Sequence, residues 1–419
     1  MSVTTLKNGM RVASVRRPGL PMDAIALNVR AGSAQEARSA RGSAHCLEHL
    51  VLGKAATVRT SGLAAAMDAL GAHPAAVTGK EATCFSVRLP CSDSADAIQA
   101  LFHAVSTAGG FDRRVLDAEK RVILAELAGA DQDAVRSALT LAESRVFAGS
   151  ELEHPPIGSR ADILDLSAEE IGRFWSLQYR PSAIDLGIVG PREHREVVSM
   201  VCESLGTEPS VADGCGRDDG VEALPPLRSA VAVEEGDGGA VIPVIQAFSA
   251  PAVRDRGRAV AVVLAALLGS GFGSLLVSAL RAKNQLVYSP RAFYTGYGLA
   301  GCFTICAPTS RENASQVARR IRGALEAVAG RAFSQGRLEY AVRQVSCATH
   351  AAWTDQQPRL RSLLSSVQYL DRVPALSELM ETVQGVSREE VAALAATMLS
   401  AEVDQLSLRA PARREAAHG

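Results

Sequence analysis

The hydrophobic and polar positions follow two different periods along the chain, which predict a set of strands and a set of helices. Runs of strand length, alternating or continuously apolar, predict strands at residues 24–32, 83–90, 183–190, 244–251, 292–298, 301–308 and 404–411. Apolar residues at helical spacing predict long helices within 113–178 and 312–400, and shorter apolar helices that end at Gly53 and Gly269. Strands separated by clusters of helices favour an α+β fold with mainly antiparallel sheets over a doubly wound parallel fold.

The two halves of the chain repeat the same order of predicted elements. Each half has a strand, an apolar helix, a second helix, one or two further strands, long helices and a closing strand. This order predicts an internal duplication of roughly 200 residues per copy. Residues 206–240 are rich in Gly, Pro, Asp and Ser and lack apolar periodicity, which predicts a linker. We therefore expect two homologous domains, 1–205 and 241–419.

One short segment carries an unusual group of polar residues. In "GSAHCLEHLVLGK", His45, Glu48 and His49 span an arc of about 100° on a helix, and the apolar residues occupy the opposite side. Two histidines four residues apart can bind the same cation. A structural cluster of satisfied polar groups is the alternative interpretation. The matching helix of the second half, 259–269, has no ligand residue, so the sequence predicts one metal site per chain.

A catalytic zinc usually has three protein ligands and a water, so this motif leaves one protein ligand to be found. Glu119 and Glu126 lie seven residues apart, on the same side of a predicted helix and within an apolar stripe. Burial of an unpaired carboxylate is costly. Coordination of a cation by one carboxylate, with the other hydrogen bonded, would offset this cost, and a solvated helix face is the alternative.

Composition and charge narrow the classes of function. The content of 47% hydrophobic and 21% charged residues is ordinary for a globular protein. A net charge of -1 without a basic tract gives no reason to expect nucleic acid or an anionic membrane as a partner. No apolar run reaches the ~20 residues of a membrane span, and the N-terminal segment lacks the pattern of a signal peptide, so we expect a cytoplasmic protein. The eight cysteines form no CxxC pair, which predicts reduced thiols, and Cys46 points away from His45 on the helix.

The spacing H-x-x-E-H is the inverzincin signature. Together with the paired glutamates of "DAEKRVILAEL", it makes the sequence resemble the pitrilysin/insulinase family of zinc peptidases, M16, in a bacterial branch of about 400 residues that is similar to mitochondrial processing peptidase. The resemblance implies a processing-peptidase-like metallohydrolase fold with zinc as the cofactor. It implies that His45, His49 and Glu126 bind the zinc, that Glu48 is the general base, and that Glu119 is a supporting carboxylate.

The resemblance extends to the second half and includes two departures. "GSLLVSALRAKNQLVYSPRAFY" is similar to a family segment in which an arginine and a tyrosine, here Arg281 and Tyr288, reach the substrate carbonyl near the zinc. Ala75 and Ala76 stand where the family usually has Asn-Ala, so an amide that contacts the peptide is missing. Leu275 stands where an arginine is common. Both departures bear on efficiency and substrate preference.

The family implies an endopeptidase for short peptides or unfolded and leader segments, enclosed in a chamber that a homodimer or a heterodimer with a homologous subunit forms. An edge strand near 75–83 would bind the peptide in extended form by backbone pairing. A binding or scaffold subunit of a heteromeric peptidase complex is the alternative, and the intact set of ligands and base argues against it. A metal-binding protein without hydrolytic activity is a third hypothesis, which would make Glu48 incidental.

Overall fold

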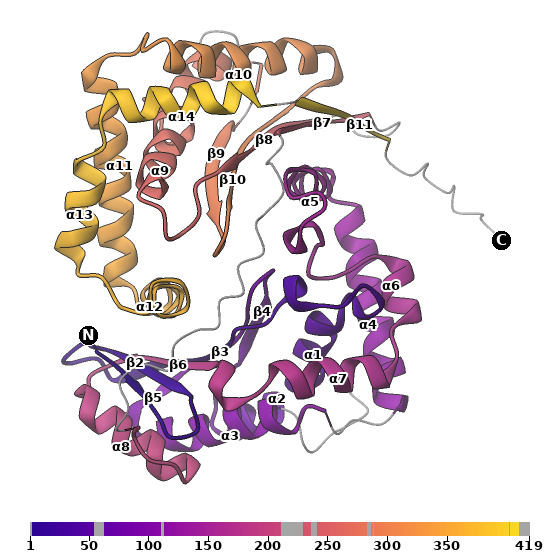
Figure 1. The fold of residues 1–419 in the computed structure, drawn as a ribbon, viewed down its shortest axis with the longest axis vertical. Helices are drawn as coiled ribbons and strands as arrows, with labels where there is room; N and C mark the ends of the chain where they lie inside the picture. Colours follow the sequence, from indigo (N-terminus) through magenta and orange to yellow (C-terminus); the bar gives the residue numbers. More distant parts are fainter. Residues whose placement is uncertain are drawn as a thin grey trace. The chain divides into compact units, whose positions relative to one another are not determined.

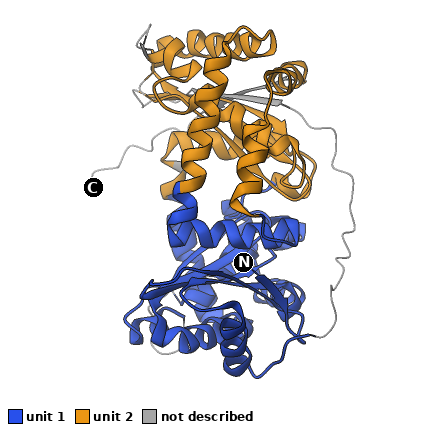
Figure 2. Cartoon of the chain, turned by 90° about the vertical axis from the view of Figure 1, so that its left-hand side faces the viewer, with its two compact units in different colours: residues 1–128, 154–222, 351–374 blue, residues 129–153, 223–350, 375–419 orange. Residues whose placement is uncertain are grey.

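The structure is a computed structural model that describes residues 2–53, 63–109, 113–210, 229–235, 241–282, 286–287, 289–401 and 403–409. The chain forms two compact units, and neither is contiguous in the sequence (Figure 2). The first unit comprises residues 1–128, 154–222 and 351–374, and the second comprises 129–153, 223–350 and 375–419. The expected domain ranges were 1–205 and 241–419. Residues 129–153, which fall in the first range, belong to the second unit, and residues 351–374, which fall in the second range, belong to the first unit.

The first unit is built on a six-stranded sheet with the strand order β1-β2-β6-β3-β5-β4 (Figure 1). β2 and β6 run parallel, and the other neighbouring strands are antiparallel. The strands are β1 (Ser2–Thr5), β2 (Arg11–Arg16), β3 (Met22–Val29), β4 (Ala75–Thr78), β5 (Thr83–Pro90) and β6 (Ile184–Gly190). Among the described strands β4 pairs only with β5, so β4 forms an edge of this sheet.

Helices cover both faces of this sheet, and β6 is consequently buried along its whole length. The helices are α1 (Ser43–Leu52), α2 (Leu63–Ala69), α3 (Ser94–Thr107), α4 (Arg113–Asp131), α6 (Arg160–Asp165), α7 (Ala168–Gln178), α8 (His194–Leu205) and α12 (Gln356–Leu370). Ile25 and Leu27 of β3 face a core shared with α1, α3, α7 and α8, whereas Ala24 and Ala26 face α12. A Cβ at Gly187 would lie 2.9 Å from side-chain atoms of α12, so this glycine lets α12 approach the sheet closely.

The second unit is built on a five-stranded sheet with the order β11-β7-β8-β10-β9. Its strands are β7 (Ser229–Glu235), β8 (Ile242–Ala250), β9 (Arg291–Gly296), β10 (Gly301–Thr309) and β11 (Val403–Arg409), and only the β11–β7 pair is parallel. Its helices are α5 (Ala134–Val146), α9 (Gly257–Gly269), α10 (Ala314–Ala329), α11 (Gln335–Thr354), α13 (Leu376–Gln384) and α14 (Arg388–Ser400). α9, α10 and α14 form the core with β8 and β10, and α5 contacts β7 and β8.

These elements confirm the predicted α+β class with mainly antiparallel sheets. The strands predicted at 83–90, 183–190 and 301–308 agree with β5, β6 and β10 to within a residue at each end. We expected the range 206–240 to be a linker, but residues 229–235 of that range form β7. This strand belongs to the sheet of the second unit because it pairs with both β8 and β11. Residues 211–228 and 236–240 of that range lie outside the described part of the chain.

Two further expectations concern the whole chain. None of the helices that the structure describes combines the length and the apolar character that a bilayer crossing requires. The cysteines in the described residues are all free thiols.

Candidate metal centre

The H-x-x-E-H segment forms the middle of α1, and this helix is buried on all sides. His45, Glu48 and His49 are only 8%, 4% and 1% exposed. The helix begins after Gly42, whose φ of 86° and whose proximity to Ile163 both favour glycine, since an added Cβ would lie 2.6 Å from the Ile163 side chain. Because the polar side chains of α1 are removed from water, they need partners within the protein or a bound cation.

A carboxylate that no sequence pattern identifies holds the start of α1. Glu36 accepts hydrogen bonds from the backbone N–H groups of Gly42, at 2.9 Å, and Ala44, at 2.8 Å. Burial raises the pKa of Glu36 to about 8, although these two hydrogen bonds act in the opposite direction. Glu36 therefore satisfies two of the free N–H groups at the start of the helix that carries His45.

His45, His49 and Glu126 bring three possible ligand atoms together. Within the described residues they form a group that could hold a metal ion, with all three atoms within 4.8 Å of one another. Oε2 of Glu126 lies 3.9 Å from Nε2 of His45 and 3.5 Å from Nε2 of His49. Tetrahedral ligands at about 2.0–2.1 Å from zinc lie about 3.3 Å apart, so these separations are close to those of a metal site.

The ring of His49 is oriented by a second carboxylate from α4. Glu119 is fully buried, and its Oε2 lies 3.2 Å from Nδ1 of His49. When Nδ1 carries the proton and donates a hydrogen bond to Glu119, Nε2 keeps its lone pair, and Nε2 is the nitrogen that faces Glu126. Nε2 of His49 is buried and has no hydrogen-bond partner among the described residues, which fits a cation at this position. Glu126 thus lies beside Nε2 of both histidines, and Glu119 lies beside Nδ1 of His49.

Cys46, between the two histidines in sequence, takes no part in this group. Its thiol is fully buried, and burial raises its pKa to about 12. The three residues whose ligand atoms lie together do not include Cys46.

Glu48 contacts the edge strand β4. The hydroxyl of Thr78 donates a hydrogen bond to Oε2 of Glu48 at 2.7 Å. Ala75 and Ala76, which replace the Asn-Ala of the family pattern, lie in the same strand. Thr78 is therefore a further residue in contact with the site. The sequence had placed it only within the expected edge strand, 75–83, and had not singled it out.

The second half of the chain was expected to contribute two residues to the site, Arg281 and Tyr288. Arg281 lies in the second unit, in the π-helical segment Val277–Ala282. Its side chain is exposed, and its guanidinium carbon lies 5.5 Å from the centre of the Phe272 ring. Tyr288 lies outside the described residues. The roles implied for Arg281 and Tyr288 therefore stay predictions.

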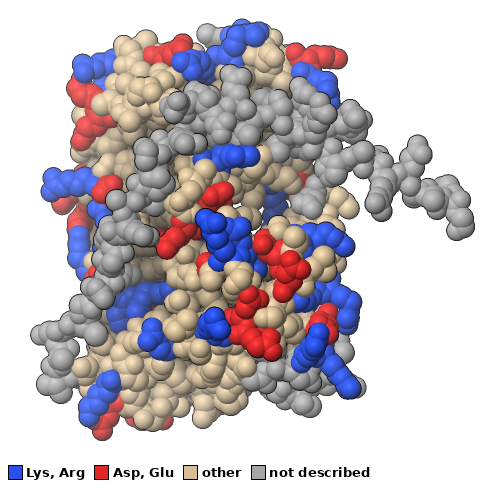
Figure 3. All heavy atoms as spheres, turned by 45° about the vertical axis from the view of Figure 1, so that its right-hand side comes forward, with Lys and Arg blue, Asp and Glu red and all other residues tan. Residues whose placement is uncertain are grey.

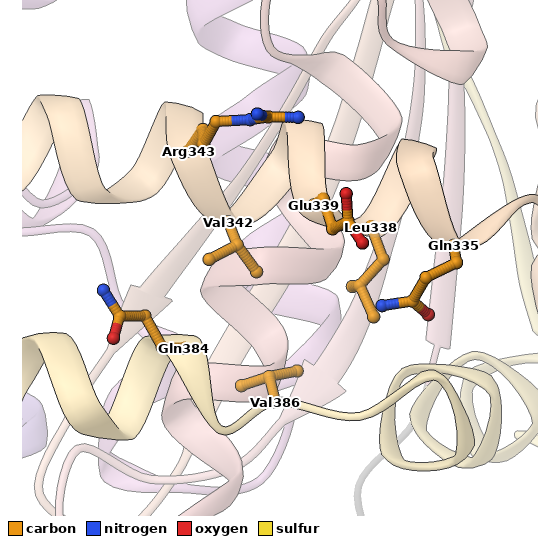
Figure 4. Close-up of a pocket in the computed structure, with 7 residues that line it drawn as sticks. All are labelled: Gln335, Leu338, Glu339, Val342, Arg343, Gln384 and Val386. Carbon is orange, nitrogen blue, oxygen red and sulfur yellow. The ribbon is translucent and has the colours of Figure 1, made fainter.

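The second unit contains a cavity that lies apart from the predicted site residues. It has a volume of about 280 Å³ and lies between α11 and the end of α13 (Figure 4). Leu338, Val342 and Val386 point toward one another at its centre, and Glu339 and Arg343 lie at its exposed rim. None of the predicted site residues lines it.

Comparison with protein families gives two matches that together span most of the chain. Residues 11–159 match the family "Insulinase (Peptidase family M16)". Residues 165–345 match "Peptidase M16 inactive domain". The first match contains His45, Glu48, His49, Glu119 and Glu126.

Individual proteins are similar over comparable lengths. An uncharacterized zinc protease of Streptomyces coelicolor is 25% identical over 403 residues, which cover 94% of this chain and 86% of the relative. Subunit 1 of the bovine mitochondrial cytochrome b-c1 complex is 26% identical over 318 residues, covering 73% and 65%. The crystal structure of a protease from Helicobacter pylori superposes with a TM-score of 0.85 at 16% identity, over 98% of this chain and 99% of that one, which supports the fold.

Proposed function

The chain belongs to the insulinase family of peptidases, M16, and on this premise we propose that it is a zinc-dependent endopeptidase. Its proposed substrates are short peptides and unfolded or leader segments. The observation that carries the proposal is that possible ligand atoms of His45, His49 and Glu126 lie close together. The buried carboxylate of Glu48 lies on the same helix as the two histidines. Two imidazoles and one carboxylate are the protein ligands of a catalytic zinc site that keeps a further position for water.

The residues of the first unit have distinct tasks in this proposal. When bound, zinc lowers the pKa of a coordinated water toward about 7 and polarises the peptide carbonyl. Glu48 accepts the proton of the attacking water and passes it to the nitrogen of the leaving amine. Glu119 keeps the proton of His49 on Nδ1, so that Nε2 remains a ligand atom.

Substrate binding is assigned to the edge strand β4. Its backbone pairs with β5 on one side, and the side chain of Val77 is 68% exposed. An extended peptide that adds to this edge gains main-chain hydrogen bonds, which select an extended conformation more than a sequence. Since Ala75 supplies no amide side chain, we expect this strand to hold the peptide by its backbone.

The proposed partners are a peptide and a homologous subunit. Following the family, we propose a homodimer or a heterodimer that encloses the site and limits access to peptides and unfolded segments. Nucleic acid is not among the proposed partners. On the face shown in Figure 3, basic and acidic side chains are interspersed, and the basic ones form no continuous area of the kind that binds a polyanion.

A second candidate function is that of a binding or scaffold subunit in a larger complex. The similarity to subunit 1 of the bovine cytochrome b-c1 complex favours it, as does the match of residues 165–345 to a domain described as inactive. The presence of all three ligand residues together with Glu48 and Glu119 favours the peptidase. The two candidates differ in whether the chain itself breaks peptide bonds.

Mass analysis of a peptide library incubated with the purified zinc-loaded chain tests the proposal. A peptidase yields defined internal cleavage products that disappear when a chelator removes the metal and return with added zinc. The incubation is done with the chain alone and with any homologue that is encoded beside it. Absence of products in both incubations would favour the scaffold function.

A further inference from the structure

We propose that Thr78 is a positioning residue that ties the general base, Glu48, to the edge strand on which the substrate is proposed to pair. The inference rests on the proposed function, because it gives Thr78 a role in the reaction assigned to Glu48. Thr78 does not itself touch the reacting atoms. It acts by fixing the direction of the Glu48 carboxylate.

The contact between the two side chains is short and charge-assisted. The Thr78 hydroxyl donates to Oε2 of Glu48 at 2.7 Å, the distance of a strong O–H···O⁻ hydrogen bond. Glu48 is 4% exposed, so water does not readily replace this donor. Hydrogen bonds to a buried charge contribute more than those between neutral groups. Loss of the hydroxyl therefore removes the donor that directs Oε2 of Glu48 toward β4.

Thr78 is suited to this task by its place in the strand. Threonine branches at Cβ and has few rotamers, so the position of β4 determines where its hydroxyl points. Side chains alternate along β4, where Ala75 and Val77 are exposed and Ala76 and Thr78 are half-buried. Ala76 packs against the core that contains α1, and Thr78 shares that face of the strand.

The backbone that follows Thr78 is held firmly. The N–H of Ala34 donates to the carbonyl of Lys80 at 2.7 Å, and a Cβ on Gly32 would lie 2.2 Å from the carbonyl oxygen of Gly79. The strand is thus anchored immediately after Thr78, whereas the edge of residues 75–78 pairs only with β5 among the described strands. A peptide that extends the sheet along this edge would order the same segment that directs Glu48.

Three single variants test the proposal. Thr78→Val keeps the size of the side chain and removes the hydroxyl, and Thr78→Ser restores a hydroxyl. Thr4→Val is the matched control: Thr4 lies in β1, at the other edge of the same sheet, it is half-buried, and its hydroxyl forms a hydrogen bond with Nε2 of His194 at 2.9 Å. Thr4→Val therefore loses a side-chain hydrogen bond of this sheet at a place remote from the contact to Glu48.

The first readout is the kinetics of peptide hydrolysis with zinc-loaded protein. Thr78→Val should lower kcat by about 10- to 100-fold while KM changes by less than about 3-fold. Thr78→Ser should recover most of this loss. The zinc content should equal that of the wild type in every variant, and Thr4→Val should lower the melting temperature but leave kcat close to the wild-type value.

The second readout needs no activity. Crystal structures of the zinc-loaded wild type, Thr78→Val and Thr78→Ser should show Glu48 in one rotamer when the hydroxyl is present and in another rotamer, or in several, when it is absent. An unchanged Glu48 rotamer in Thr78→Val, or an unchanged kcat in an active enzyme, overturns the positioning role. If the wild type cleaves no peptide, the proposed function fails separately, and the crystal structures still decide whether Thr78 positions Glu48.

Discussion

The carboxylate of Glu119 lies 3.2 Å from Nδ1 of His49, on the side of the imidazole opposite to Glu126. This arrangement predicts that Glu119 strengthens metal binding without touching the metal. Glu119→Gln removes the charge that favours a proton on Nδ1, so the affinity for zinc should fall by about 10- to 100-fold. Competition with a chromophoric chelator measures this affinity.

Asp117→Asn is the matched control for Glu119, because Asp117 lies on the same helix, is exposed and also loses one negative charge in the substitution. Its zinc affinity should remain at the wild-type value. Equal affinities of Glu119→Gln and the wild type would show that the contact to His49 does not support metal binding.

The single ligand helix predicts one zinc per chain. Elemental analysis of protein purified without added metal should give a ratio near one, and His49→Ala should lose the metal because it removes a buried ligand. His103→Ala, which alters an exposed histidine of α3 in the same unit, should keep it. Two zinc ions per chain, or full zinc content in His49→Ala, would contradict this site.

Glu36 gives the protein a specific dependence on pH. Burial raises the pKa of Glu36 from 4.5 to about 8 in the folded state. The stability that its protonated form contributes is therefore complete below about pH 4.5 and is lost as the pH rises toward about 8. Glu36→Gln stays neutral throughout, so its melting temperature should fall less steeply between about pH 5 and 8 than that of the wild type.

Thermal unfolding of zinc-free wild type and variant measures this difference without a contribution from metal binding. Glu169→Gln, which alters an exposed carboxylate near the start of α7, should follow the wild-type pH dependence. If Glu36→Gln and the wild type lose stability in parallel over this range, the carboxyl of Glu36 is not held protonated in the fold.

The family resemblance predicts that Tyr288 donates to the substrate carbonyl oxygen. Tyr288→Phe should lower kcat by about 10²- to 10³-fold, the usual effect of removing one such donor, while the zinc content is unchanged. Tyr294→Phe is the control, since the hydroxyl of Tyr294 donates to the carbonyl of Pro251 at 2.7 Å within its own unit. Equal turnover by Tyr288→Phe and the wild type would remove Tyr288 from the site.

Local helical periodicity explains which parts of the site the sequence revealed. His45 and His49 are four residues apart, and Glu119 and Glu126 are seven apart, so each pair shares one side of its helix whatever the rest of the fold does. The contact between α1 and α4 then assembles the group. The residues with long-range or irregular contacts were not found in this way: Glu36 reaches α1 from a loop, and Thr78 meets Glu48 through the packing of β4 on α1.

The same distinction applies to the fold. The alternation of β5 and the mainly apolar runs of β6, β8 and β10 identify these strands, because burial on one or both faces leaves a pattern in sequence. An amphipathic pattern does not specify which sheet a helix covers. The sequence therefore did not reveal that α5 packs on the sheet of the second unit and α12 on the sheet of the first.

The central claim, that Glu48 is a base and Glu126 a ligand, is tested most directly by zinc content and peptide hydrolysis measured together in Glu48→Gln and Glu126→Gln. Glu48→Gln keeps the size of the side chain but cannot accept the proton, so it should retain zinc while hydrolysis falls by ~10² to 10⁴. Glu126→Gln replaces an anionic ligand with a neutral one and should lose zinc more readily. Release of zinc by Glu48→Gln with retention by Glu126→Gln would exchange the two roles, and cleavage by both variants at the wild-type rate would contradict the peptidase itself.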